Sequence, residues 1–501
     1  MNASLPLDAL RVEDLTVWHG QQPLVGGVSF AVPAGGVLSL LGESGSGKSL
    51  LAQAIMGNLP ASLRATGAIF QAGQYSDAAD GRSRQSGWGR RIALLPQEPW
   101  LALDPTMTVA RQVAETYELV SQSAPDQQNE SLRRARSQAA ASARRALASL
   151  GLEAAADKYP FMISGGMAQR VAFLATHAAG APLMIIDEPT KGLDVDRRGE
   201  VLALLQAAQA EGMSLLCITH DVWLARALGG QLAVLQDGAM VEQGSAEALL
   251  AQPRHAYTRR LLAADPACWP RPEVRTPSAH AAVIAELREI SKSFGEQALF
   301  AGVSARIHAG EVVAVSGPSG SGKTSLGNIV LGLLQPDSGQ VIRAPGLPRT
   351  AFQKIYQDPA AAFAPTIPLR RSLQDLVRLH GLPWQELEAL LERMRIAPAL
   401  LDRLPRQVSG GELQRIALAR VLLMKPALIF ADEPTSRLDP LTQQEVMALL
   451  VEQARAVGSA VLLVTHDADI VRCVADRRLT LSPAGQSQSQ SQSRSRSRSA
   501  H

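Results

Sequence analysis

Two segments of this chain carry the pattern G-x-x-x-x-G-K-[ST], whose residue types suit the binding of phosphates. They are Gly42-Glu43-Ser44-Gly45-Ser46-Gly47-Lys48-Ser49 and Gly317-Pro318-Ser319-Gly320-Ser321-Gly322-Lys323-Thr324. Glycines let backbone N–H groups turn inward around phosphates, and a following helix N-terminus adds partial positive charge. The lysine supplies a cation for the β- and γ-phosphates, and the Ser49 or Thr324 hydroxyl is a ligand for Mg²⁺. A glycine-rich turn would explain one copy, but two copies in matching order predict two nucleotide sites.

A pair of acidic residues follows an apolar run in each half of the chain. The pairs are Asp187-Glu188 and Asp432-Glu433. The aspartates are predicted to hold Mg²⁺ through its water shell, because that ion keeps several waters. The glutamates are predicted to polarise the attacking water. An acidic helix cap is the simpler interpretation, but it does not explain why both pairs lie downstream of phosphate loops.

A histidine and a glutamine also recur once in each half. His220 and His466 each end an apolar run, which favours a sensor that hydrogen-bonds the γ-phosphate and orients the water over a structural cap. Gln97 and Gln357 lie in short Pro-containing segments. A neutral amide there can reach Mg²⁺ and the water, although neither glutamine would be informative alone.

A second type of anion site is predicted where Ser-Gly-Gly opens a helix-compatible run. The two segments are Ser164-Gly165-Gly166 and Ser409-Gly410-Gly411. Their backbone amides and the helix N-terminus suit a phosphate. An ordinary helix start does not explain why each half has one such segment besides a full phosphate loop.

The elements that must position these residues are short buried strands. Apolar runs at 37–41 and 312–315 precede the phosphate loops, and the runs at 183–186 and 427–431 precede the acidic pairs. Continuous apolar runs of this length are typical of parallel strands, whose carboxyl ends hold ligands in α/β sheets. The order of elements is the same in both halves, so the sequence predicts an α/β fold with two tandem nucleotide-binding domains.

Spacing between matched residues shows where the halves differ. Lys48 and Lys323 are 275 residues apart, whereas Asp187 and Asp432 are 245 apart. The first half therefore has extra residues, which we place at 121–145 and expect to form an exposed helix or a flexible insert. For its five arginines a solvated helix face is favoured over binding to acidic lipid or a partner. These residues are Arg133, Arg134, Arg136, Arg144 and Arg145.

Length and composition set the domain boundaries. A chain of 501 residues with 46% hydrophobic residues suits two cores. We predict a first domain at 1–264, a Pro-rich linker at 265–281, a second domain at 282–482 and a disordered Ser/Gln/Arg tail at 483–501. A formal net charge of +3 gives no bias toward nucleic acid or anionic lipid. Three scattered cysteines predict a reducing compartment. Each cysteine is expected to be a small buried hydrophobic residue.

The N-terminal residues lack a continuous apolar core and do not resemble a signal peptide. The sequence also has no apolar stretch long enough to span a bilayer. If the protein serves a membrane process, another chain must therefore supply the membrane part.

Together these motifs resemble a pair of ABC-transporter nucleotide-binding domains fused head to tail, over residues 7–482. The resemblance implies two P-loop NTPase domains of the ABC ATPase type, each with a helical subdomain. It also implies that ATP lies between the phosphate loop of one domain and the Ser-Gly-Gly segment of the other, so that Lys48 pairs with 409–411 and Lys323 with 164–166. Segments 192–194 and 437–439 match the family's D-loops, and both glutamates are present, which implies two hydrolysing sites.

Two features of the family pattern are less regular here. Met167 and Glu412 stand where the family often has Gln, a modest change because the Ser-Gly-Gly amides remain. The aromatic residue that stacks on adenine would be Trp18 or His19 in the first half and Phe294 in the second.

A narrower resemblance is to the ATPases that drive dipeptide, oligopeptide and nickel import. Residues 97–105 are similar to the Q-loop of those proteins, and residues 253–262 to the tail that ends their domains; the second half lacks this tail. The resemblance implies an ATPase that uses ATP and Mg²⁺ to power an importer for peptides, nickel or a metal–chelator complex. It implies two transmembrane permease subunits, a solute-binding protein reached through them, and a peripheral place at the cytoplasmic side of the inner membrane. Only Cys268 lies where some members carry a cysteine cluster, so we expect no iron–sulfur cluster.

Other members of the superfamily offer alternative functions. The carbon–phosphorus lyase machinery contains ATPases of very similar sequence that would dock on soluble enzymes. Tandem translation factors normally carry a long charged helical linker, and the short Pro-rich linker argues against that class. DNA-repair ATPases need zinc-binding cysteine clusters, which this sequence lacks, and no nucleic-acid partner is expected.

Overall fold

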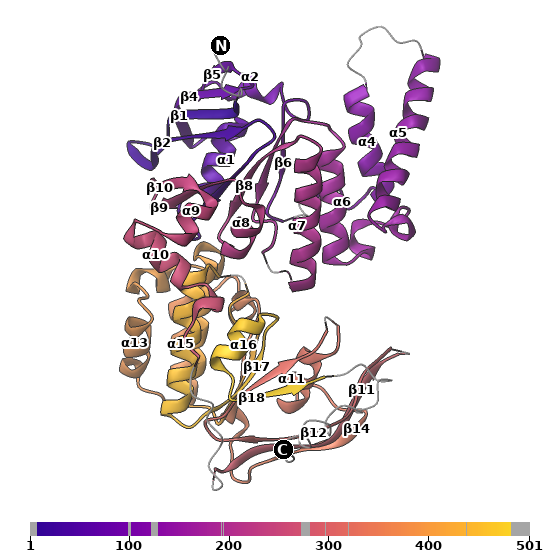
Figure 1. Cartoon of the computed structure of the whole chain (residues 1–501). Helices are drawn as coiled ribbons and strands as arrows, with labels where there is room; N and C mark the ends of the chain where they lie inside the picture. Colours follow the sequence, from indigo (N-terminus) through magenta and orange to yellow (C-terminus); the bar gives the residue numbers. More distant parts are fainter. Residues whose placement is uncertain are drawn as a thin grey trace, which may run out of the picture. The chain divides into compact units, whose positions relative to one another are not determined.

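The computed structural model describes residues 8–481, except 99–101, 122–128, 192, 194, 272–280, 296, 319 and 437. The chain divides into two compact units, one formed by residues up to Asp265 and the other by nearly all residues from Pro266 onward. Each unit contains an antiparallel sheet, a mainly parallel sheet and a set of helices (Figure 1).

Within the described residues, the first unit contains ten strands in two sheets. The antiparallel sheet has the order β2-β1-β4-β5, and the second sheet has the order β10-β9-β3-β8-β7-β6. All strands of the second sheet are parallel except β10. The strands are β1 Asp8–His19, β2 Gln22–Pro33, β3 Val37–Leu41, β4 Leu63–Gln71, β5 Gln74–Asp77, β6 Ile92–Leu95, β7 Leu183–Asp187, β8 Ser214–Thr219, β9 Gln231–Gln236 and β10 Ala239–Ser245.

Alternation along the parallel strands builds two cores. In β7, Leu183 and Ile185 pack toward the antiparallel sheet and α1, whereas Met184 and Ile186 pack toward the helices on the other side. All four side chains are at most 1% exposed. A strand covered on both faces must be apolar throughout, and this is why the sequence shows continuous apolar runs here.

Helices cover the parallel sheet of the first unit, and α6 and α7 stand between it and the pair α4 and α5 (Figure 1). The helices are α1 Lys48–Met56, α2 Gly81–Gln85, α4 Val109–Ser121, α5 Asn129–Ser149, α6 Gly165–His177, α7 Val195–Ala210, α8 Val222–Leu228, α9 Ala246–Ala251 and α10 Ala256–Ala263, with 3₁₀ turns η1 Glu153–Ala155 and η2 Pro160–Met162.

Much of the extra segment of the first half forms α5. It is not fully exposed, because Ala139, Ala143 and Leu147 are buried at a spacing of four residues, along one face of the helix. Residues 122–128 of the predicted insert lie outside the described residues. The segment is therefore in part a packed component of the helical subdomain.

The described part of the second unit contains eight strands in two sheets. The antiparallel sheet has the order β12-β11-β14, and the parallel sheet has the order β15-β16-β17-β13-β18. The strands are β11 Val283–Phe294, β12 Gln297–His308, β13 Val312–Ser316, β14 Ser338–Arg343, β15 Phe352–Ile355, β16 Leu428–Asp432, β17 Ala460–Val464 and β18 Arg477–Thr480. Thus β13, β16 and β17 repeat the positions of β3, β7 and β8.

The helices of the second unit follow the same plan. They are α11 Lys323–Val330, α12 Leu369–His380, α13 Trp384–Arg393, α14 Gly410–Leu423, α15 Pro440–Ala456 and α16 Ala468–Val474, with 3₁₀ turns η3 Pro266–Cys268, η4 Arg349–Ala351, η5 Pro359–Ala362, η6 Pro398–Asp402 and η7 Pro405–Gln407. The start of the predicted linker packs on this unit, because Trp269 is 8% exposed and its carbonyl accepts a hydrogen bond from Cys473. The predicted tail at 483–501 lies outside the described residues.

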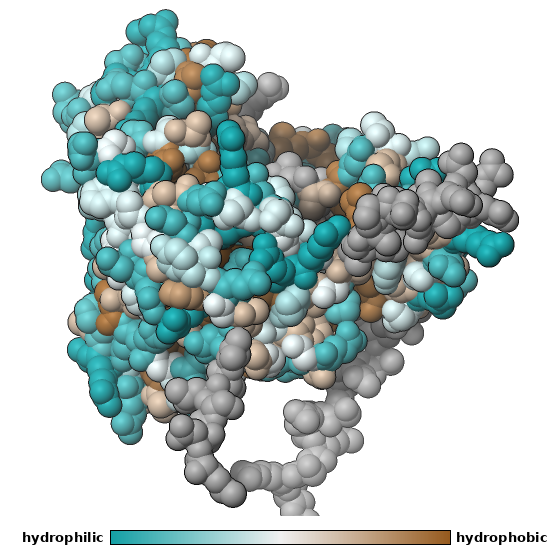
Figure 2. Space-filling model, turned by 90° about the horizontal axis from the view of Figure 1, so that it is seen from above, coloured by the Kyte–Doolittle hydropathy of each residue, from teal (hydrophilic) through white to brown (hydrophobic). Residues whose placement is uncertain are grey.

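Within the described part of the chain, no helix is both long enough and apolar enough to span a membrane. On the face shown in Figure 2, hydrophobic residues lie scattered among hydrophilic ones. Cys217 and Cys473 are buried, whereas Cys268 is exposed, so the expectation of a buried side chain is wrong for Cys268. It lies in η3, a short turn without buried residues.

Candidate functional site

Both phosphate loops lie at the carboxyl ends of parallel strands, between β3 and α1 and between β13 and α11. Gly47 and Gly322 precede the helices with φ of 99° and 86°, a backbone conformation that favours glycine. At Gly42, a Cβ would lie 2.4 Å from the Leu235 carbonyl oxygen, so only glycine fits this close approach. Ser319 lies outside the described residues. Both loops therefore have the strand–loop–helix form that a phosphate cradle requires.

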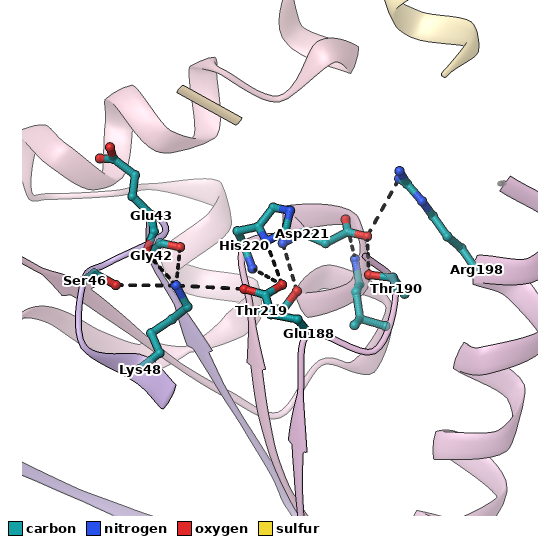
Figure 3. Close-up of polar contacts among 11 residues, drawn as sticks. Gly42, Glu43, Ser46, Lys48, Glu188, Thr190, Arg198, Thr219, His220 and Asp221 are labelled. Atoms are coloured by element: carbon teal, nitrogen blue, oxygen red, sulfur yellow. Dashed lines mark hydrogen bonds and ion pairs between the residues drawn. The ribbon is translucent and has the colours of Figure 1, made fainter. Parts of the chain in front are cut away.

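The two lysines are folded over their own loops. Lys48 Nζ donates hydrogen bonds to the carbonyl oxygens of Gly42 and Glu43 at 2.8 and 2.7 Å, and lies 4.0 Å from Glu188 Oε1 (Figure 3). Lys323 Nζ makes the same two bonds to Gly317 and Pro318, both at 2.9 Å. Burial lowers the pKa of Lys48. Each ammonium is thus held in the loop, where a phosphate would provide compensating negative charge.

Glu188 and Glu433 are held in an unusual backbone conformation at the ends of β7 and β16. Their φ angles are 51° and 47°, in the left-handed region that non-glycine residues rarely adopt. Each backbone N–H donates to a carbonyl of the neighbouring strand, at Ile218 (2.8 Å) and Val464 (2.9 Å). Such strain is typical of functional sites and persists only when surrounding contacts hold it. Both units thus hold this glutamate in the same backbone conformation.

Each glutamate is paired with the predicted histidine. His220 Nδ1 lies 2.6 Å from Glu188 Oε2, and His466 Nε2 lies 2.8 Å from Glu433 Oε1. Burial raises the pKa of Glu188, but the adjacent His220, with Lys48 and Lys191, more than offsets this effect and leaves the pKa below its ordinary value. Glu188 is therefore kept as a carboxylate, the form that accepts a hydrogen bond from water.

The hydroxyl and the aspartate predicted to bind Mg²⁺ come together in both units. The Ser49 hydroxyl hydrogen-bonds the Asp187 carboxylate, and Thr324 Oγ1 donates to Asp432 Oδ1 at 3.0 Å. Burial raises the pKa of Asp187, whose Oδ1 atom has no hydrogen-bond partner among the described residues. A buried carboxylate oxygen beside a hydroxyl suits a hard cation with oxygen ligands. The residues present therefore fit Mg²⁺.

The two predicted glutamines differ in their contacts with the neighbouring glutamate. Gln357 Nε2 donates a hydrogen bond to Glu433 Oε2 at 2.6 Å. Gln97 follows β6 at the same place as Gln357 follows β15, but within the described residues it makes no such bond to Glu188. The structure thus brings together Glu, His and Gln in the second unit, and Glu and His in the first.

The Ser-Gly-Gly segments begin helices, as expected. Ser164 caps α6 by accepting a hydrogen bond from the Met167 N–H, and Ser409 caps α14 by accepting one from the Glu412 N–H. Glu412 also accepts hydrogen bonds from the Ser409 N–H and hydroxyl, at 3.1 and 2.6 Å, which completes a capping box. The pairing of each segment with the opposite phosphate loop stays a prediction.

Comparison with known families settles the class of protein. The ABC transporter family matches residues 25–191 and 300–436, which include both phosphate loops and both acidic pairs. The chain belongs to the ABC transporter family. The predicted resemblance and fold are confirmed, and the two units contain ATP-binding domains of an ATPase coupled to transport.

Curated relatives of this ABC protein span nearly its whole length. It is 32% identical over 509 residues to an uncharacterized ABC transporter ATP-binding protein, YejF, from Escherichia coli K12, covering 94% of this chain and 93% of the relative. It is 32% identical over 507 residues to the peptidoglycan transport ATP-binding protein YejF of Agrobacterium fabrum, covering 93% and 90%. It is 31% identical over 538 residues to the glutathione import ATP-binding protein GsiA of Salmonella typhimurium LT2, covering 94% and 84%.

Among solved structures, this ABC protein is similar to the archaeal ribosome recycling factor aABCE1, with a TM-score of 0.63 and 21% identity. The match covers 90% of this chain and 83% of that one. At this identity the likeness shows the fold alone: a tandem pair of ABC ATPase domains.

Strand register resolves which residue of the first ABC domain corresponds to Phe294. His19 pairs with Gln22 at the end of the β1–β2 hairpin, and Phe294 pairs with Gln297 at the end of the β11–β12 hairpin. The matching residue is therefore His19. Trp18 is engaged elsewhere, because its Nε1 donates to Thr66 and the Arg64 guanidinium lies over its ring.

Two further residues contact the sites and were missed by sequence reasoning. The Tyr257 hydroxyl, from α10, accepts a hydrogen bond from the Glu43 N–H of the first phosphate loop at 3.1 Å. Lys354 Nζ, from β15, lies 3.2 Å from Asp432 Oδ2. The second was detectable, because residue-by-residue comparison of the halves sets Lys354 against an apolar Leu94.

Proposed function

We propose that this chain is the ATP-hydrolysing subunit of an ABC importer for peptides or peptide-like solutes. Its two ATPase domains would pair within one polypeptide, and two transmembrane permease subunits would hold it at the cytoplasmic side of the inner membrane. The observation that carries this proposal is the presence of two complete sites in one chain, each with a phosphate loop and an intact glutamate–histidine pair. Relatives that match 93–94% of this chain are named for import or transport.

The geometry supports a simple division of labour in each site. Lys48 and Lys323 would leave their loop carbonyls to bind the β- and γ-phosphates. Bound Mg²⁺ would neutralise phosphate charge. It would be held by Asp187 and Ser49 in the first unit and by Asp432 and Thr324 in the second. Glu188 and Glu433 would accept a hydrogen bond from the attacking water, and the paired histidine would orient the carboxylate and contact the γ-phosphate.

The cargo is proposed at the level of chemical class. Glutathione is a peptide and peptidoglycan contains peptides, so the printed functions of the relatives favour a peptide-like cargo. Nickel or a metal–chelator complex is the alternative cargo within the same class of importers. No residue described here is assigned to the cargo, because selectivity would reside in the solute-binding protein and the permeases.

Identification of partners tests the importer proposal. Glu188→Gln and Glu433→Gln together should retain ATP and keep the ATPase on its permeases. The tagged double variant, purified from its native cell in mild detergent with ATP, should carry two multi-span membrane proteins identified by mass spectrometry. The matched control is the double variant Lys48→Ala with Lys323→Ala, which should not bind ATP. This variant should retain less of both membrane proteins.

Soluble enzymes, such as those of a carbon–phosphorus lyase assembly, or ribosomal proteins in place of permeases would contradict the proposal. If permeases are found, uptake of labelled glutathione and of a short peptide should be measured in cells with and without the gene. Uptake that needs intact Glu188 and Glu433 would support a peptide-like cargo. If the gene is needed for uptake of nickel and of neither peptide, nickel would replace a peptide-like solute as the proposed cargo.

A further inference from the structure

The second phosphate site contains a lysine besides the one in its loop. Lys354 lies on β15 with its side chain 12% exposed, and its Nζ is 3.2 Å from Asp432 Oδ2. The same Nζ donates to Asn328 Oδ1 at 3.1 Å. It also lies 5.1 Å from the centre of the Phe430 ring and 5.2 Å from that of Tyr356, distances suited to a cation–π contact. The ammonium is thus fixed from several sides beside the carboxylate predicted to hold Mg²⁺.

The surroundings of Lys354 are matched to it. A Cβ at Gly327 of α11 would lie 2.1 Å from the Phe430 ring, so glycine is required for this ring to fit between α11 and β16. The next residue, Asn328, supplies the oxygen that Lys354 contacts. The pocket that receives the ammonium therefore depends on several positions on three different elements.

Apart from the aspartate, the first unit has none of these residues at the matching positions. Leu94 pairs with Ile185 in the register in which Lys354 pairs with Phe430. Four and five residues after the loop lysine, α1 has Ala52 and Gln53 where α11 has Gly327 and Asn328. Asp187 keeps a buried oxygen that has no hydrogen-bond partner in the described part of the chain. The ammonium beside the metal-binding carboxylate is therefore a property of the second site.

We infer that Lys354 makes the two ATP sites unequal in their dependence on Mg²⁺. Without a divalent ion, the buried Asp187 oxygen of the first site has no cation in direct contact among the described residues, because Lys48 and Lys191 act on Asp187 only at longer range, and its remaining charge disfavours ATP. In the second site the Lys354 ammonium offsets one carboxylate, so ATP without metal is tolerated. When a divalent ion is present, the same ammonium repels the ion and reduces the gain in ATP affinity that the ion provides. Lys354 is thus a positioning residue that sets metal dependence, and this inference rests on the nucleotide sites proposed above.

Photolabelling distinguishes the two sites without relying on turnover. The full chain carrying Glu188→Gln and Glu433→Gln would be labelled with 8-azido-ATP, and the labelled peptides of each half quantified by mass spectrometry. Measurements would be made in excess Mg²⁺ and after chelation with EDTA. We expect chelation to raise the nucleotide concentration for half-maximal labelling of the first half at least about tenfold more than that of the second half.

Variants assign the difference to Lys354. In Lys354→Met the second half should become as metal-dependent as the first, whereas Lys354→Arg should keep the difference. Leu94→Met is the matched control and should change neither half. Lys354→Gln serves as a second neutral variant if Lys354→Met shows a lowered melting temperature.

Specific results would overturn the inference. One such result is an equal response of both halves to chelation. The other is a second half whose metal dependence is unchanged in Lys354→Met and Lys354→Gln. Failure of both halves to label with Mg²⁺ present would instead contradict the nucleotide sites themselves, and the inference with them.

Discussion

The side-chain amide of Gln357 donates a hydrogen bond to Glu433 Oε2 at 2.6 Å, while His466 Nε2 lies 2.8 Å from the other oxygen of that carboxylate. Both oxygens of Glu433 are therefore held. In the first unit His220 provides both contacts to Glu188 Oε2, through Nδ1 at 2.6 Å and its backbone N–H at 3.3 Å. The two glutamates thus have the same backbone conformation but different partners, so their roles have to be tested separately.

Replacing both glutamates should stop hydrolysis and spare ATP binding. Glutamine has the shape of glutamate but cannot act as a base, so Glu188→Gln with Glu433→Gln should lower the rate by about 100-fold or more. Steady-state phosphate release and equilibrium binding of a fluorescent ATP analogue measure the two effects. Each single variant should leave one competent site. If both single variants keep full activity, the proposed base role is wrong.

Local chemistry was predictable from the sequence, whereas contacts between distant segments were not. Each phosphate loop is one continuous segment in which glycine and lysine spacing already encodes the turn, so Lys48 and Lys323 were found directly. Glu188 and His220 were each predicted to be functional because each follows an apolar run, but their pairing was seen only in the structure. In contrast, the Tyr257 contact with Glu43 joins residues 214 positions apart, and no local pattern specifies it.

Tertiary packing also explains the expectations that changed. The segment that forms α5 was expected to be an exposed helix or a flexible insert, yet Ala139, Ala143 and Leu147, at a spacing of four, are buried along one face. The choice between Trp18 and His19 required strand register, which depends on the hairpin turn and not on residue type. Lys354 was visible in the sequence, but its meaning depended on the position of Asp432 on the neighbouring strand.

Removing the Tyr257 hydroxyl should weaken nucleotide binding in the first domain alone. The hydroxyl accepts from the Glu43 N–H, and a typical hydrogen bond contributes about 0.5–1.5 kcal/mol, or about two- to tenfold in affinity. Burial raises the pKa of Tyr257 above its ordinary value, so the hydroxyl stays neutral at working pH. Tyr257→Phe should show this loss in photolabelling of the first half. An equal loss in the second half would show that the effect is not local to this loop.

Adenine stacking should distinguish the two hairpin ends. Phe294 is 54% exposed at the end of β11, where an adenine ring could cover it. An aromatic pair contributes about 0.5–1.5 kcal/mol beyond buried area, so Phe294→Ala should lower ATP affinity of the second half by about two- to tenfold. His19→Ala is the matched change in the first half. Substitution of the exposed Tyr75, which lies on β5, should affect neither half, and a loss there of the same size would contradict a specific stacking role.

Glu311 links two strands next to the second phosphate loop and should make their stability depend on pH. Its carboxylate accepts from Arg477 Nε at 2.8 Å and from the His308 N–H at 2.9 Å, which joins the start of β13 to β18. Burial raises the pKa of Glu311, but these hydrogen bonds and the Arg477 charge more than offset it, so the pKa lies below its ordinary value of 4.5. A carboxyl with a lowered folded-state pKa stabilises the fold above its ordinary pKa, and this stabilisation is lost as pH falls below 4.5 through the folded-state value.

Glu311→Gln should therefore lower the free energy of opening of β13 and β18 by about 1–3 kcal/mol at pH 7. Hydrogen exchange of peptides that cover these strands, followed by mass spectrometry, measures that free energy for both proteins at the same pH. The difference between wild type and variant should shrink progressively below pH 4.5, because the wild-type carboxyl then becomes protonated. Peptides from β3 and β9 in the first unit should exchange alike in both proteins. A difference that stays constant down to pH 3 would mean that packing, and not the ionised carboxylate, stabilises this junction.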